Sequence, residues 1–233
     1  NFLNNSGKAD KEIKIYITHS KSDKIDVVIE DNGSGMKNLQ DSFRAGRKTG
    51  VNYKADSIFN EHGLGLKNAL AKANPQNDDW KIFTKSNENE NIFTVINSPY
   101  MVNHKLNYET TTNLNKWPTD NRYKTGTAIN FSCSFGLFKT INKRRRDSFH
   151  NFIKDLREEL GVIYRPVMQK DNIDIAVYRK GLEETRFDKI KVKPISPDNE
   201  ELIKAEGKTK SLINPGEFLV PTDNGNVKVE YKF

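Results

Sequence analysis

The 233-residue sequence contains one cysteine, four histidines and no apolar run that approaches the length of a membrane span. A transmembrane helix needs roughly 20 apolar residues, and the N-terminus also lacks the basic-then-apolar pattern of a signal peptide. The histidines show no spacing typical of a metal site. A single cysteine excludes an internal disulfide, so we expect Cys133 to be a small buried thiol. These absences favour a cytoplasmic protein without a membrane segment.

Charge and aromatic content limit the class of partner. Charged residues make up 30% of the chain and hydrophobic residues 35%, while 13 Phe and 8 Tyr are enough to build a core. The net charge of +7 and pI of about 9.2 suit a polyanionic partner, either a nucleotide or a nucleic acid. A basic balance alone is a weak signal, so it leaves contact with DNA open.

Alternating apolar residues predict strands through the first part of the chain. EIKIYITHS (12–20) and KIDVVIED (24–31) are predicted to pair as antiparallel strands around the turn KSDK. DWKIFTKS, NIFTVINS and GTAINFSCSF are predicted as further strands, and LKNALAKAN as a helix ending at Asn74-Pro75. The pattern therefore predicts a mainly antiparallel sheet backed by helices.

A second unit is predicted to begin near residue 140. In RRRDSFHNFIKDLREELGVIYRPVM the apolar residues fall at helical spacing, and Gly161 is expected to mark the end of this helix. NIDIAVYRKG (172–181) and NVKVEYKF at the C-terminus alternate as strands. We therefore predict a first domain at residues 1–140 and a second, which could be incomplete, at 141–233.

The segment IEDNGSGM (29–36) ends an apolar strand with an aspartate and two alternate glycines. By itself, Asn32-Gly33 is typical of a type I′ hairpin turn. Such a turn leaves Asp31, Gly35 and Met36 unexplained. Glycines after a strand also allow the backbone to approach a planar ligand, and Asp31 could accept a hydrogen bond from an exocyclic amine. Taken alone, the segment fits both interpretations.

A second glycine pair follows about 30 residues later, in NEHGLGLKNAL (60–70). Gly63 and Gly65 stand at the start of a predicted helix, where free N–H groups and the helix dipole favour phosphate, and Lys67 adds a positive charge. The segment has neither the βαβ context of a Rossmann fold nor the spacing of a Walker A loop. Between the two glycine pairs, residues 37–62 are expected to form a mobile loop that acts as a lid.

These segments together resemble the motifs of the GHKL ATPases, which include gyrase B, the heat-shock chaperone of ninety kilodaltons, histidine kinases and MutL, with the MORC proteins alongside. IEDNGSGM resembles the D-x-G-x-G motif and HGLGLKNAL the second glycine box. SFRAGRKTG resembles the lid segment of the MORC and MutL branches, and KTGTAINF the strand that closes the nucleotide site. LGVIYRPVMQKDNIDIAVYRKG resembles the opening of a transducer domain. The resemblance covers about residues 1–185.

The resemblance implies an α/β sandwich of the Bergerat type, with a mainly antiparallel sheet backed by helices, followed by the start of a transducer-like domain. It implies that Asp31 contacts the adenine amino group and that Thr127 lies near the base. Phosphates would be held by the second glycine box and covered by the lid. The implied nucleotide-binding residues are Asp31, Gly33, Gly35, Met36, Gly46, Lys48, Gly63, Leu64, Gly65, Lys67 and Thr127.

The resemblance also implies Mg²⁺ bound by an asparagine of a helix before the first strand, with a general-base glutamate one turn earlier. In NFLNNSGKAD the metal ligand is either Asn5 or Asn1. If it is Asn5, Asn1 replaces the glutamate and hydrolysis should be poor. If it is Asn1, the glutamate would lie before residue 1. Both registers stay open.

Our leading hypothesis is a GHKL ATPase of MORC- or MutL-like layout that binds ATP and Mg²⁺ and closes its lid to dimerise, in a DNA-related process. One alternative is a basic nucleic-acid-binding module whose glycines serve only as turns. Another is a histidine-kinase catalytic domain, although the lid segment and the long C-terminal part of the chain argue against it.

Overall fold

The computed structural model describes residues 11–21, 23–37, 39, 65–75, 80–87, 91–96, 101–102, 105–120, 124–136, 148–195, 216–222 and 225–231. Within these ranges no helix is both long and apolar enough to cross a membrane. The strands are β1 Lys11–Lys21, β2 Lys24–Asp31, β3 Trp80–Lys85, β4 Ile92–Ile96, β5 Met101–Val102, β6 Lys105–Leu106, β7 Tyr108–Thr111, β8 Gly126–Ser134, β9 Ile173–Lys180, β10 Asp188–Lys191, β11 Gly216–Thr222 and β12 Gly225–Tyr231. The helices are α3 Gly65–Ala73, the 3₁₀ turn η1 Leu114–Lys116, α5 Phe149–Ile163 and α6 Arg165–Lys170.

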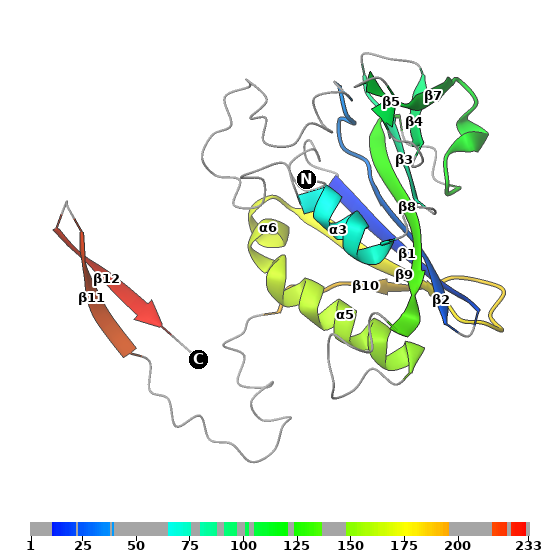
Figure 1. Cartoon of the computed structure of the whole chain (residues 1–233). Helices are drawn as coiled ribbons and strands as arrows, with labels where there is room; N and C mark the ends of the chain where they lie inside the picture. The colour runs from blue at the N-terminus through cyan, green and yellow to red at the C-terminus, as the bar shows by residue number, and fades with distance from the viewer. Residues whose placement is uncertain are drawn as a thin grey trace.

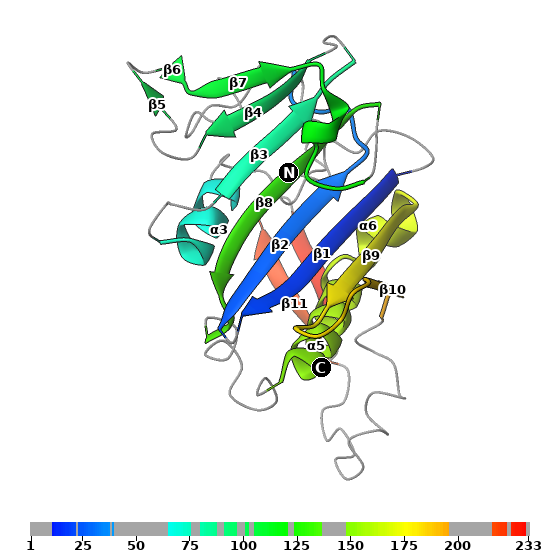
Figure 2. The same ribbon diagram turned by 90° about the vertical axis from the view of Figure 1, so that its right-hand side faces the viewer.

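One eight-stranded sheet organises the described residues, in the order β10-β9-β1-β2-β8-β3-β4-β7 (Figure 1). Its neighbouring strands are antiparallel except for β1 and β9, which are parallel. Helices α3, α5 and α6 all lie on one face of this sheet, as the two views show (Figure 2). The predicted architecture, a mainly antiparallel sheet backed by helices in an α/β sandwich, is confirmed.

The largest core cluster lies where α5 and α6 cover β1, β2 and β9. On β1 the alternate residues Ile13, Ile15 and Ile17 face these helices, as period-2 patterning predicts. Helix α5 begins at its cap Ser148, whose hydroxyl accepts a hydrogen bond from the Asn151 N–H at 3.2 Å. Cys133 lies in this core, and burial raises the pKa of its thiol to about 11, which confirms a buried, protonated thiol.

Two smaller clusters lie on opposite faces of the other half of the sheet. The cluster on the helix side contains Leu70 of α3 together with Ile82 and Ile129 of the sheet. The cluster on the other face consists of Phe83, Ile92, Trp117 and Ala128. Trp117 directly follows η1, so this segment covers the open face of the sheet at that point. Trp80 and Trp117 are both buried and serve in packing.

The register of the parallel pair β1–β9 places Tyr16 directly beside Tyr178. Their rings stack at a centroid distance of 4.6 Å, and Phe187 packs edge-on against Tyr16 at 5.3 Å. Phe187 belongs to the connection that leads from β9 to β10. Ring stacking therefore fixes both the parallel register and the course of this connection across the open face.

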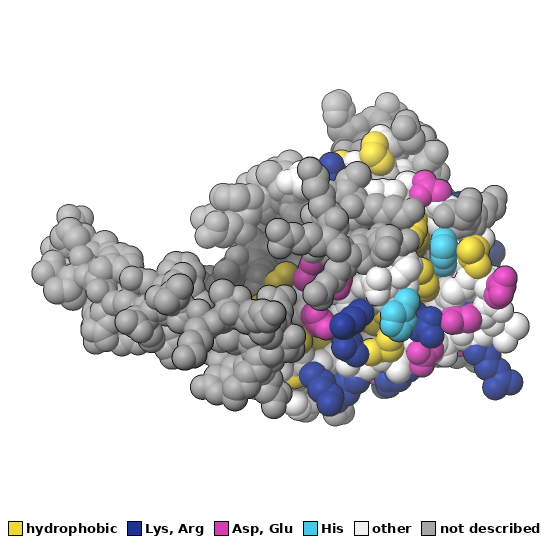
Figure 3. Space-filling model, turned by 90° about the horizontal axis from the view of Figure 1, so that it is seen from below, with side chains coloured by type: hydrophobic (Ala, Val, Ile, Leu, Met, Phe, Trp, Pro, Cys, Tyr) yellow, Lys and Arg dark blue, Asp and Glu magenta, His cyan; other side chains and the backbone are white. Residues whose placement is uncertain are grey.

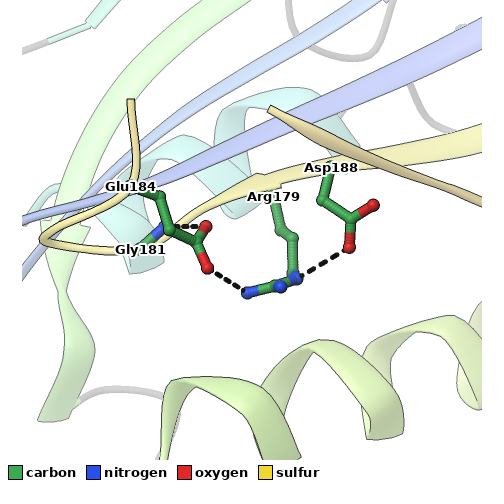
Figure 4. A network of polar contacts seen from close by, with 4 residues as sticks. All are labelled: Arg179, Gly181, Glu184 and Asp188. Carbon is green, nitrogen blue, oxygen red and sulfur yellow. Dashed lines mark hydrogen bonds and ion pairs between the residues drawn. The ribbon is translucent and has the colours of Figure 1, made fainter. Parts of the chain in front are cut away.

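The turn between β9 and β10 is held by Arg179, which bridges two carboxylates (Figure 4). Its Nη1 lies 2.9 Å from Glu184 Oε1 and its Nε lies 3.2 Å from Asp188 Oδ2. The other oxygen of Glu184 accepts a hydrogen bond from the Gly181 N–H at 2.7 Å, and these contacts lower the pKa of Glu184. Arg179 lies near the end of β9, Asp188 begins β10, and Glu184 lies in the turn between them, so the network holds the two strands and their turn together.

The predicted end of the long helix at Gly161 is wrong, because α5 continues to Ile163 and α6 follows directly. Gly161 is required for a different reason. A Cβ on this residue would lie 2.4 Å from the carbonyl oxygen of Lys193, so the glycine allows residues after β10 to cross the helix closely. The Ile195 N–H also donates a hydrogen bond to the Gly161 carbonyl at 3.0 Å.

The predicted division at residue 140 stays a prediction. Segments from both sides of it meet in the described residues, because β9 pairs with β1 and α5 packs on the cluster around Ile15. The strands β11 and β12 form a separate two-stranded antiparallel sheet, in agreement with the predicted C-terminal strand.

Candidate functional site

Three polar residues occupy one level of three neighbouring strands. Asp31 ends β2 and lies opposite Thr127 of β8, which in turn lies opposite Thr84 of β3. Residues directly opposite each other in antiparallel strands point to the same face. That face is the helix side, because Ile29, Ile129 and Ile82 two positions along each strand pack there. We call Asp31, Thr127 and Thr84 the polar row; none is more than 2% exposed.

The Asp31 carboxylate has one oxygen with a partner and one without. Oδ1 accepts a hydrogen bond from the Gly33 N–H at 2.7 Å. Oδ2 is buried and receives no hydrogen bond from any residue that the structure describes. Burial raises the pKa of Asp31 from 3.8 to about 7, because desolvation outweighs the opposing effect of the nearby Gly33 and Thr127 backbone N–H groups. A buried carboxyl oxygen without a donor is rare in folded proteins and suits a ligand that supplies one.

The two threonine hydroxyls form a connected network with the loop that follows β2. The Met36 N–H donates to Thr84 Oγ1 at 2.8 Å. The Thr84 hydroxyl lies 3.2 Å from the Gly126 carbonyl oxygen and 3.3 Å from Thr127 Oγ1. The loop of residues 32–36, called the glycine loop below, is therefore attached to β3 through Thr84.

Glycine is required at two positions around the polar row. Gly35 has a φ of +69°, and a Cβ there would lie 2.1 Å from the Lys85 carbonyl oxygen. A Cβ on Gly126 would lie 2.1 Å from the carbonyl oxygen of Asp31. Backbone packs directly on backbone at both places. Neither Asn32 nor Gly33 has a positive φ, so the type I′ turn considered for this segment is wrong.

Glu30 precedes Asp31 and points to the opposite face of β2, because successive side chains of a strand alternate between its faces. It is fully buried and accepts hydrogen bonds from Trp117 Nε1 at 3.2 Å and Thr119 Oγ1 at 2.5 Å. These contacts give Glu30 a structural role. Two buried carboxyl groups thus stand back to back across one sheet, and the charge of Glu30 adds to the raised pKa of Asp31.

The structure also brings the two glycine segments together. Met36 from the first and Leu66 from the second pack against the same helix-side cluster, which contains Leu70. Gly65 is the first residue of α3 and Lys67 lies in its first turn, where the helix was predicted to start. Several predicted site residues lie outside the described residues, namely Asn1, Asn5, Gly46, Lys48, Gly63 and Leu64.

Sequence reasoning missed Thr84, Ser86 and Gly126. Ser86 is buried two positions after Thr84, and its Oγ receives no hydrogen bond within the described part of the chain. A signal for Thr84 was present in WKIFTK, because strand alternation places it on the buried face of Trp80 and Ile82. A polar residue in that alternating set is a candidate for a buried hydrogen-bond network.

Within the ranges that the structure describes, no group of three or more His, Cys, Asp or Glu side chains could hold a metal ion. The sequence-predicted magnesium ligand, Asn5 or Asn1, lies outside those ranges.

One family model matches the chain, described as "Histidine kinase-, DNA gyrase B-, and HSP90-like ATPase", over residues 1–127. This match covers more than half of the 233 residues and includes all three members of the polar row. No match was found among curated proteins.

Solved structures give fold-level likenesses of low sequence identity. The N-terminal domain of a DNA repair protein is 15% identical with a TM-score of 0.42, covering 90% of this chain and 55% of that one. The MutL ATPase domain of Aquifex aeolicus complexed with ADP is 13% identical with a TM-score of 0.37, covering 89% and 64%. A second Aquifex aeolicus MutL ATPase domain is 9% identical with a TM-score of 0.37, covering 95% and 64%. The chain thus spans 55–64% of the length of these solved chains.

Proposed function

Because the chain belongs to the histidine kinase-, DNA gyrase B- and HSP90-like ATPases, we propose that it binds ATP with the adenine base against the polar row. The observation that carries this proposal is the buried Oδ2 of Asp31, which has no donor within the described residues. The 6-amino group of adenine is such a donor. Gly35 and Gly126 support the proposal, because only backbone stands beside the row at those positions.

Asp31 is suited to this role by its position and by its environment. Its carboxyl group is held by the Gly33 N–H at 2.7 Å, so Oδ2 keeps one direction without a rotamer change. A hydrogen bond formed where water is excluded is worth more than one formed in water, and it also selects between bases. A base with a carbonyl oxygen at position 6 would place an acceptor against an acceptor, so Asp31 favours adenine over guanine.

We extend the proposal to the phosphates through the second glycine segment. The start of α3 carries Gly65 and Lys67, and helix N-termini favour anions. The lid residues Gly46 and Lys48, with Gly63 and Leu64, are assigned to the phosphate side from the family resemblance. Mg²⁺ held by Asn5 or Asn1 would neutralise phosphate charge when bound. If Asn5 is the ligand, Asn1 replaces the general base and turnover should be slow.

Asp31→Asn tests the base contact. The asparagine amide keeps the size of the side chain but cannot ionise. Its NH₂ group can also face the adenine amino group, which places a donor against a donor. At pH 8, where Asp31 is ionised, we expect ATP affinity to fall by about tenfold or more, the value of one hydrogen bond to a charged group. Titration calorimetry of the full chain with ATP and Mg²⁺ measures this. Asp174→Asn is the matched control, because Asp174 is an exposed partner of Lys191 on the open face, and we expect it to bind ATP as the wild type does.

Two results of that titration would contradict the proposal. The first is no binding of ATP by the unaltered chain. The second is equal affinity of the wild type and Asp31→Asn for ATP. Steady-state phosphate release measured on the same samples tests hydrolysis separately from binding.

Lid closure and dimerisation are proposed as the use made of ATP. A ligand that contacts both lid and sheet favours the closed state by its differential affinity for the two states. Light scattering with a non-hydrolysable ATP analogue would then show a dimer that is absent without nucleotide.

For a DNA-related role the support is the net charge of +7. Among the described residues on the face seen in Figure 3, Lys and Arg are interspersed with Asp and Glu, so these residues do not form a basic surface for DNA.

A further inference from the structure

Thr84 joins two parts of the candidate site that are far apart in the sequence. Its Oγ1 accepts a hydrogen bond from the Met36 N–H, 48 positions earlier, at 2.8 Å. The same oxygen lies 3.3 Å from the hydroxyl of Thr127, 43 positions later. Thr84 is fully buried, so water does not compete for these contacts.

The number of protons limits how this network can be arranged. A threonine hydroxyl donates one hydrogen bond and accepts up to two. If Thr84 donates to the Gly126 carbonyl oxygen, 3.2 Å away, Thr127 can donate to Thr84 and then presents only lone pairs to a ligand. If Thr84 donates to Thr127, the proton of Thr127 is available to a ligand. Thr84 therefore determines which hydrogen-bonding group Thr127 presents beside Asp31.

We propose that Thr84 is a positioning residue for nucleotide binding, which couples the glycine loop to the base contact by holding the Met36 amide and the Thr127 hydroxyl together. This inference rests on the proposed function. In it, adenine meets Asp31 through its amino group and Thr127 through the neighbouring ring-nitrogen acceptor. The second arrangement above supplies the donor that this acceptor needs.

A structural role alone would not require this geometry. For structure alone, a buried threonine needs only one acceptor for its hydroxyl, and the Gly126 carbonyl oxygen, 3.2 Å away, would be enough. In addition, Thr84 Oγ1 accepts a hydrogen bond from the Met36 N–H. The Met36 side chain packs against the cluster that contains Leu70 of α3. A shift of Thr127 on binding a base is thus transmitted to the loop and to the contact with the helix.

The test is a double-mutant cycle on ATP affinity, measured by calorimetry with the full chain and Mg²⁺. Thr84→Val keeps the shape and removes the hydroxyl, and we expect about tenfold weaker binding. Thr84→Ser restores the hydroxyl and should bind within about threefold of the wild type. In Thr127→Val the contact to the base is already lost, so adding Thr84→Val should change affinity little. Additive effects, or a Thr84→Ser variant as weak as Thr84→Val, would overturn the inference.

Hydrogen exchange of the Met36 amide gives a second test that needs no change at Thr84. We expect ATP to slow exchange of this amide in the wild type and to slow it clearly less in Thr127→Val. Equal slowing in both proteins would show that Thr127 and the loop are not coupled. No ATP binding by the wild type overturns the proposed function together with this inference. ATP binding that Thr84→Val leaves unchanged overturns this inference alone.

Discussion

At the scale of single residues, the polar row contains a carboxyl group that is buried before any ligand arrives. Asp31 has only the Gly33 N–H on Oδ1 and nothing on Oδ2 among the described residues. A structural carboxylate in such a place normally accepts hydrogen bonds from the protein, as Oε2 of Glu30 does from Trp117 and Thr119. The two neighbours thus differ: Glu30 fixes the segment after η1, whereas in the proposed function Asp31 keeps its second oxygen for the adenine amine.

The raised pKa of Asp31 predicts a pH dependence of stability with a definite sign. Its pKa is about 7 in the folded chain and near 3.8 when unfolded. Above pH 4 the unfolded chain releases this proton while the folded chain still holds it, so stability falls as pH rises from 4 to 7. At 1.36 kcal/mol for each pKa unit, the loss is about 4 kcal/mol.

Urea denaturation of the wild type and Asp31→Asn from pH 4 to 8 measures this effect. The wild type should lose stability relative to the variant across pH 4–7 and change little above it. A difference that stays constant, or one that rises with pH, would contradict the assigned environment of Asp31.

The sequence identified residues whose signal is local and missed those whose partners are distant. Asp31, Gly33 and Gly35 stand within five positions, so their motif could be recognised. Thr84 bonds to partners more than 40 positions away on both sides, and only the pairing of β3 with β8 brings them together. The partial charges and burial that raise the pKa of Asp31 likewise arise from packing, which periodicity does not encode.

At the scale of elements, alternation and helical spacing predicted β1, β2, α3, β9 and the long helix because each buries one regular face. The end of α5 was misjudged at Gly161, where glycine serves tertiary packing instead of helix termination. Its missing Cβ makes room for the Lys193 carbonyl oxygen, and that contact is invisible in the local sequence. Gly65 differs, since a Cβ there would meet nothing within 4 Å.

Gly161→Ala is therefore predicted to destabilise the protein although alanine favours a helix by about 1 kcal/mol. The new Cβ would lie 2.4 Å from the Lys193 oxygen and 3.0 Å from Ile195 Cγ1. Backbone must shift to relieve this, and overpacking of this kind costs about 1–3 kcal/mol. The midpoint of urea denaturation should fall. Lys154→Ala, an exposed position of the same helix, should change stability by less than about 0.5 kcal/mol; a more stable Gly161→Ala would contradict the contact.

At the scale of the whole molecule, the strand order depends on contacts that the sequence pattern leaves undetermined. Alternation shows that residues 12–20 and 172–181 are strands but not that they are neighbours. The parallel pairing of Lys11–Thr18 with Ile173–Lys180, together with the stacked Tyr16 and Tyr178, makes them adjacent. Through this pairing, α5 and α6 cover the isoleucines of β1.

This arrangement predicts that residues on both sides of position 140 unfold together, whereas two independent domains would unfold separately. Trp80 and Trp117 precede that position. Phe152 of α5 follows it and is buried in the core around Ile15, with 2% of its surface exposed. Phe152→Leu should cost about 1 kcal/mol. If unfolding is cooperative, tryptophan fluorescence and far-UV circular dichroism will shift to the same lower urea midpoint. Leu182→Ala, a residue 54% exposed, should shift neither signal. If Phe152→Leu lowers the dichroism midpoint but leaves the fluorescence midpoint unchanged, the result would instead support separate domains at residues 1–140 and 141–233. The two tryptophans would then report the unfolding of a unit whose stability does not depend on α5.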